Sequence, residues 1–149
     1  MNEPVGRMRW AVKESFIEYV RALEDGTIDA FDGAGWEDGA FVFPADASGD
    51  AGVSFSGGVR FRGFAGMLDV RLAEPMIEGD GAGMRLTALV GPESIAARAP
   101  IATLDATELP RAGESWTATP KLTFEGMRIF GDVYQVGAEL AQLVVDPER

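Results

Sequence analysis

The sequence contains no histidine and no cysteine. Without an imidazole the chain cannot build a Ser-His-Asp or Cys-His catalytic site, a His-ligated zinc site or an HExxH helix. Without a thiol it has no disulfides, thiolate metal sites or cysteine nucleophiles, although an exported protein need not contain cysteine. Most familiar enzyme sites are therefore excluded, and we expect a binding protein rather than an enzyme.

Positive charge is also scarce, with 13 basic against 24 acidic residues and a net charge of -11. This balance disfavours nucleic acid and anionic membrane surfaces as partners. No apolar run approaches the roughly 20 residues that span a bilayer, so we expect no membrane insertion. Residues 1–9 lack the apolar core of a secretory signal. We therefore expect a cytoplasmic location, with a trimmed exported domain as the alternative.

The 149 residues are 46% apolar and 25% charged, which is typical of one globular domain. Residues 13–24 are predicted to form an amphipathic helix that ends at Gly26, because apolar side chains recur there at helical spacing. These apolar side chains are Phe16, Tyr19, Val20 and Leu23.

The rest of the chain has the period of strands separated by turns about every ten residues. Residues 53–64 show it best, with Val59 and Phe61 on one face and Arg60 and Arg62 on the other. The prediction is a mainly β fold, a single antiparallel β-barrel or sandwich with one or two short helices. Further strands are expected at residues 8–12, 27–31, 40–43, 68–72, 85–90, 95–104, 116–124 and 139–145, a loop at 45–52, and a short helix or turn at 125–134.

Three blocks of this sequence resemble the HtaA domain of actinobacterial heme-uptake proteins. The first holds Trp10, Lys13, Glu14, Ser15, Phe16, Tyr19 and Val20; the second runs from Val53 to Pro75; the third includes Leu122, Thr123, Gly126, Phe130, Tyr134 and Leu140. They occur in order through nearly the whole chain. We therefore expect residues 1–149 to form a single HtaA-like domain.

The resemblance implies that the chain binds ferric heme through a tyrosine of the first helix, which here is Tyr19. A phenolate is a hard anionic ligand suited to ferric iron, and Phe16 is expected to provide an apolar neighbour for the porphyrin. Arg60 and Arg62 are candidates for binding the propionates, because arginine pairs well with carboxylates. Another heme-carrying protein is the expected partner.

One position departs from the family pattern. Phenols ionise at about pH 10, so an iron-binding tyrosine needs help in losing its proton. In the family this help comes from a histidine, and the matching position here is Phe64. We therefore expect weakened or altered heme binding, and we expect Phe64 to face the same cavity as Tyr19.

Several residues also have a purely structural interpretation. Tyr19 could be a half-buried core residue, Arg60 and Arg62 could simply face solvent, and Tyr134 is expected to pack one end of the fold with its hydroxyl at the rim. The acidic loop at residues 46–52 does not match a calcium-binding EF-hand.

Two alternative functions remain open at the level of sequence. The first is an HtaA-like domain that has lost heme and binds another apolar ligand or a protein partner. The second is a small enzyme that uses a pair of carboxylates, since 24 acidic residues allow many pairs and none stands out.

Overall fold

The computed structural model describes residues 6–80 and 83–147; the expected domain over residues 1–149 includes ends that lie outside these ranges. The helices are α1 (Glu14–Ala22) and α2 (Phe124–Ile129), with 3-10 turns η1 (Phe64–Gly66) and η2 (Glu93–Ile95). The strands are β1 (Arg7–Trp10), β2 (Thr27–Phe31), β3 (Gly35–Glu37), β4 (Ala40–Phe43), β5 (Ala45–Ser48), β6 (Gly52–Phe55), β7 (Gly58–Gly63), β8 (Leu68–Asp80), β9 (Gly83–Val90), β10 (Ala97–Leu104), β11 (Trp116–Ala118), β12 (Pro120–Leu122) and β13 (Leu143–Asp146).

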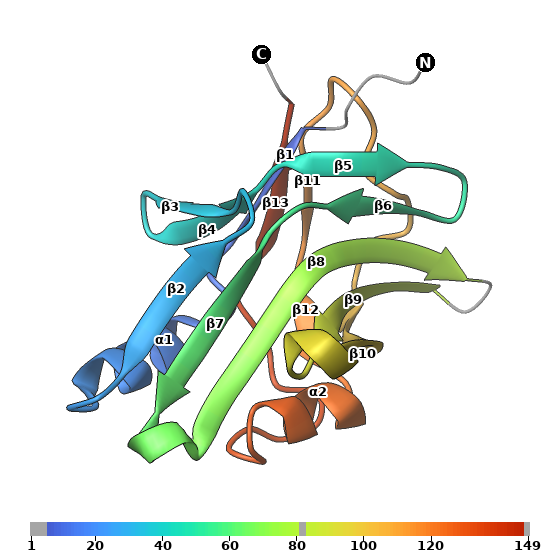
Figure 1. Cartoon of the computed structure of the whole chain (residues 1–149). Helices are drawn as coiled ribbons and strands as arrows, with labels where there is room; N and C mark the ends of the chain where they lie inside the picture. Colours follow the sequence, from blue (N-terminus) through green and yellow to red (C-terminus); the bar gives the residue numbers. More distant parts are fainter. Residues whose placement is uncertain (1–5, 81–82, 148–149) are drawn as a thin grey trace.

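The strands form two antiparallel sheets arranged as a sandwich (Figure 1). One sheet has the order β11-β13-β1-β4-β3, and the other contains β12-β10-β9-β8. The long strand β8 pairs with β9 along one edge. Along its other edge, the first half of β8 pairs with β7 and the second half pairs with β6. The predicted mainly β fold with short helices is therefore confirmed, in its sandwich form, because the described strands do not close into a barrel.

The predicted strand at residues 53–64 is broken into β6 and β7. The break falls at Gly57, whose φ of +92° favours glycine and where an added Cβ would lie 2.6 Å from Ala34. The Gly57 carbonyl instead accepts a hydrogen bond from the Glu74 amide at 2.7 Å. The prediction of one continuous strand was wrong at this point, and Phe64 lies beyond the end of β7, in η1.

Other boundaries also differ from the sequence-based expectation. The predicted loop at residues 45–52 contains β5. The predicted strand at residues 116–124 is two short strands, and these belong to different sheets. The predicted strand at residues 68–72 is longer than expected, because β8 continues through Pro75 with a bulge and ends at Asp80.

Helix α1 is confirmed, slightly shorter than predicted, and it packs through Phe16, Ile17 and Val20. The Phe16 ring meets the rings of Phe61 and Phe130 edge-on, with centroid distances of 4.9 and 5.1 Å. This contact fixes α1 across the inner face of β7, since Phe61 is fully buried. Neither described helix is long and apolar enough to cross a bilayer.

Candidate functional site

Tyr19 and Phe64 lie together where α1 and β7 end at the same side of the molecule (Figure 1). Their ring centroids are 6.1 Å apart and the rings are tilted by 51°. Both rings are open to solvent, with exposed fractions of 43% for Tyr19 and 50% for Phe64. Met67 follows on the same turn and is 90% exposed. We call Tyr19, Phe64 and Met67 the Tyr19 surface.

Asp25, in the turn after α1, holds the backbone that carries Phe64. Its two carboxylate oxygens accept hydrogen bonds from the amides of Phe64 at 3.1 Å and Ala65 at 2.7 Å. Both residues have left-handed φ values, 51° and 54°. Such a conformation costs a non-glycine residue roughly 1–3 kcal/mol, so the two hydrogen bonds offset strain in this turn. The amide of Ala65 is the main cause that lowers the pKa of Asp25.

Gly63 allows the close approach of this turn to the end of the helix. A Cβ added at Gly63 would lie 2.5 Å from the Cδ1 atom of Leu23. A larger residue would therefore displace the Leu23 side chain or push the turn away from α1. Gly63 and Asp25 together set the separation between the helix that carries Tyr19 and the turn that carries Phe64.

The hydroxyl of Tyr19 accepts and donates no hydrogen bond within the described part of the chain. Its ring contact is with Phe64, an aromatic side chain that has no polar atom to offer. The Tyr19 side chain is therefore partly exposed, and its oxygen has no hydrogen-bond partner among the described residues.

Phe16 does not belong to the Tyr19 surface. It is buried among the rings of Phe61, Phe130 and Tyr134. Tyr134 is only partly buried, and its hydroxyl lies 3.4 Å from Ser15 Oγ, which matches its expected place at the rim. The structure thus separates Phe16 from the exposed ring of Tyr19 on the same helix.

Arg60 and Arg62 lie on the face of β7 opposite to Phe61, because side chains alternate along a strand. Arg60 forms a bidentate pair with Asp69, with N–O distances of 2.9 and 2.7 Å. This contact is the main cause that lowers the pKa of Asp69. Arg62 approaches Asp29 at 3.8 Å. The structure does not bring either arginine to Tyr19.

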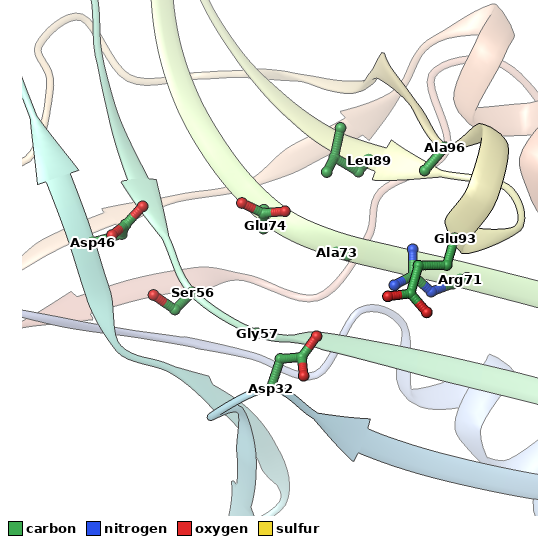
Figure 2. Close-up of a pocket in the computed structure, with 10 residues that line it drawn as sticks. All are labelled: Asp32, Asp46, Ser56, Gly57, Arg71, Ala73, Glu74, Leu89, Glu93 and Ala96. Atoms are coloured by element: carbon green, nitrogen blue, oxygen red, sulfur yellow. The ribbon is translucent and has the colours of Figure 1, made fainter.

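A cavity of about 390 Å³ lies elsewhere, over the break between β6 and β7 (Figure 2). Four carboxylates line it, and Arg71 is its one positive side chain among the described lining residues. The carboxylates belong to Asp32, Asp46, Glu74 and Glu93. Because a heme carries two propionates, this acidic cavity would repel it. No group of three or more His, Cys, Asp or Glu in the described ranges could hold a metal ion.

A second cavity, of about 340 Å³, lies between α1, β2 and the β3–β4 hairpin. Arg21 covers the Trp36 ring there at 5.2 Å from its centroid. Tyr19 and Phe64 line neither cavity. The Tyr19 surface is thus an open face of the molecule.

Comparison with known proteins identifies the family. The HtaA profile, described as Htaa, matches residues 5–146. The chain belongs to the HtaA family. No curated protein sequence matches it.

Three solved structures from Corynebacterium glutamicum share the fold. The C-terminal domain of HtaA is 24% identical with a TM-score of 0.74, over 93% of this chain and 92% of that one. The heme-binding protein HtaB is 23% identical with a TM-score of 0.75, over 94% and 90%. The N-terminal domain of HtaA is 20% identical with a TM-score of 0.72, over 100% and 99%. These likenesses confirm the HtaA fold for nearly the whole chain.

Two residues of the Tyr19 region were not singled out from the sequence. Asp25 stands directly before Gly26, which indicates a turn but gives no hint of a partner about forty positions away. Met67 follows Gly66, and an apolar residue within a glycine-containing turn is the signal that would have marked it.

Proposed function

We propose that this HtaA-family domain binds heme on the Tyr19 surface, with the Tyr19 oxygen as the iron ligand. The observation that carries the proposal is the exposed Tyr19 ring held beside Phe64 at the end of α1. Family membership and the shared fold with the heme-binding protein HtaB support the ligand class.

The chemistry of the surface suits this ligand in part. A tyrosine oxygen is a hard anionic donor that ferric iron accepts, and exposed apolar side chains favour a flat apolar ring. Phe64 supplies apolar area next to Tyr19, and Met67 is exposed on the same turn as Phe64. The Tyr19 hydroxyl has no hydrogen-bond partner in the described part of the chain, however, so we expect a weaker Fe–O bond than a hydrogen-bonded tyrosine oxygen would form.

The exposure of the site also favours heme transfer over deep storage. With 43% of Tyr19 open to solvent, an incoming protein could reach a ligand bound there without a large rearrangement. We therefore propose a second heme-carrying protein as donor or acceptor.

A hemin titration tests the iron ligand. We expect the wild type to give a saturable Soret change and a charge-transfer band. Tyr19→Phe should remove that band, because the substitution deletes the ligating oxygen and keeps the ring. Tyr134→Phe is the matched control and should retain the spectrum, since Tyr134 packs against Phe16 and Phe130. Thermal melts of all three proteins serve as a folding control.

A wild-type spectrum in the Tyr19→Phe variant would rule out Tyr19 as the iron ligand. A wild type that gives no saturable change with micromolar hemin would favour the second candidate, an HtaA-like domain that binds another apolar ligand or a protein partner. The exposed Phe64 and Met67 side chains are the observation in favour of this candidate.

A further inference from the structure

We propose that the Tyr19 surface recognises the tetrapyrrole ring itself, so that it binds metal-free protoporphyrin about as well as hemin. The inference rests on the proposed heme-binding function and specifies which part of the ligand supplies the affinity. It follows from three properties of the surface, which are its exposed apolar area, its fixed shape and the isolation of the Tyr19 oxygen.

The exposed apolar area comes from two side chains of the turn that follows β7, and both lie outside the core. Phe64 is 50% exposed and Met67 is 90% exposed, and neither contributes to the buried core. Aromatic rings and methionine sulfur both form favourable contacts with a flat π system. This area is available to the face or edge of a porphyrin whether or not the ring contains iron.

The fixed shape comes from Asp25. Two consecutive left-handed residues, Phe64 and Ala65, would relax to a commoner backbone conformation without their hydrogen bonds to the Asp25 carboxylate. The carboxylate therefore keeps the Phe64 ring 6.1 Å from the Tyr19 ring instead of allowing the turn to rearrange. A surface held in place before binding loses less conformational entropy when a ligand arrives, which favours affinity through ring contacts.

The iron contributes less because the Tyr19 oxygen is isolated. A metal ligand is strengthened by a neighbouring side chain that hydrogen-bonds it and fixes its orientation. The adjacent Phe64 side chain has no polar atom that could form such a hydrogen bond, and Arg60 and Arg62 are paired with acids on the far face of β7. The Tyr19 oxygen therefore lacks a supporting hydrogen bond within the described residues, and an Fe–O bond through it should add little to the affinity.

The experiment compares two ligands that differ in the metal alone. Wild-type protein is titrated with hemin, followed by absorbance, and with protoporphyrin IX, followed by its fluorescence. We expect dissociation constants within about tenfold of each other, a difference of about 1.4 kcal/mol. Tyr19→Phe should leave protoporphyrin affinity within about twofold of wild type, since the ring that contacts the ligand is retained.

Phe64→Ala locates the ring contact. We expect it to weaken binding of both ligands about tenfold, in line with the loss of one aromatic contact. Phe124→Ala is the matched control, because Phe124 is 57% exposed on α2, outside the Tyr19 surface, and it should change neither affinity.

Each outcome decides the proposal. If hemin binds and protoporphyrin binds more than about tenfold more weakly, ring recognition is overturned and the proposed heme-binding function stands. If protoporphyrin binds but Phe64→Ala has no more effect than Phe124→Ala, the ring is recognised elsewhere and the inference fails. If neither ligand binds, the proposed function fails with it.

Discussion

Helix α1 contributes two aromatic side chains, three positions apart, that meet opposite environments. Phe16 is buried and meets Phe61 edge-on at 4.9 Å. Tyr19 is exposed and lies 6.1 Å from Phe64, which is exposed as well. The first pair joins the helix to the inner face of β7, whereas the second pair lies just beyond the end of that strand.

The difference shows that one side chain of α1 stabilises the fold while another contributes to a candidate binding surface. The Phe16 contact removes two rings from water and links α1 to the core, which stabilises the fold. The contact between Tyr19 and Phe64 leaves both rings partly exposed to solvent. A turn with left-handed residues, hydrogen-bonded to the Asp25 carboxylate, maintains this contact. Strain and exposed apolar area are features that folding does not favour, and they are typical of a binding surface.

The largest expected effect comes from truncating the two aromatic side chains of α1, and it is on the stability of the fold. Phe16→Ala should lower the free energy of unfolding by roughly 3–5 kcal/mol, because it opens a cavity among buried rings. Tyr19→Ala should lower it by no more than about 1 kcal/mol, because Tyr19 is 43% exposed and leaves no enclosed cavity behind. Urea denaturation of both variants measures the difference. Equal losses would contradict the division between a structural and a functional aromatic pair.

The sequence predicted which residues face the core better than it predicted where strands end. Alternation assigned Val59 and Phe61 to one face, and both are buried. The alternation did not reveal the break at Gly57. Phe55 and Val59, on either side of it, are four positions apart and both buried, so the pattern of a single strand continues across the break. Strand β5 was missed because its alternate positions carry small residues that provide no apolar stripe.

The candidate site was predictable only where a motif marked it. The resemblance to the HtaA family pointed to Tyr19 and Phe64, which the structure places together. The role of Asp25 depends on hydrogen bonds that span about forty residues, and local patterns carry no such information. For Arg60 the alternation already indicated the face opposite Phe61, and that face is where the structure places it.

The next largest effect is expected on hemin affinity, from a substitution in the exposed pair of Tyr19 and Phe64. Phe64→His would put a hydrogen-bonding side chain beside the Tyr19 oxygen, which should favour the phenolate and strengthen the Fe–O bond. We expect hemin affinity to rise about tenfold, while the affinity for metal-free protoporphyrin does not rise. Parallel titrations measure both. An unchanged hemin affinity and spectrum in a normally folded variant would mean that position 64 does not act on the iron ligand.

A smaller effect should follow from removing the charge that holds the exposed pair. The pKa of Asp25 is lowered from its ordinary value of 3.8, first by the Ala65 amide. A lowered pKa means that Asp25 stabilises the fold above that ordinary value, and the contribution is lost as pH falls through the lowered pKa. The difference in unfolding free energy between wild type and Asp25→Asn should therefore be constant from neutral pH to about pH 4 and shrink below it.

Urea denaturation over a pH series measures this difference. Asp29→Asn is the matched control, because Asp29 is an exposed aspartate on the neighbouring strand β2 whose contact with Arg62 is long, at 3.8 Å. It should give a smaller difference at neutral pH. If the Asp25 variant shows no difference from wild type at neutral pH, the carboxylate does not hold the turn.

The smallest effect is expected on the far face of β7, at Arg60. Its pair with Asp69 is bidentate, but the two side chains are 37% and 39% exposed, so water weakens the attraction. Arg60→Gln should lower the free energy of unfolding by about 0.2–1 kcal/mol. This contribution should fade in acid, because Arg60 lowers the pKa of Asp69 and the pair is lost as Asp69 gains a proton.

Hemin affinity is the more informative measurement on the same variant. Arg60 and Phe61 point to opposite faces of β7, and α1 packs on the Phe61 face, so a ligand on the Tyr19 surface should not reach Arg60. We therefore expect Arg60→Gln to bind hemin with wild-type affinity. A loss of about tenfold or more would instead mean that Arg60 leaves Asp69 to bind a propionate, and that the ligand extends around the edge of the sheet.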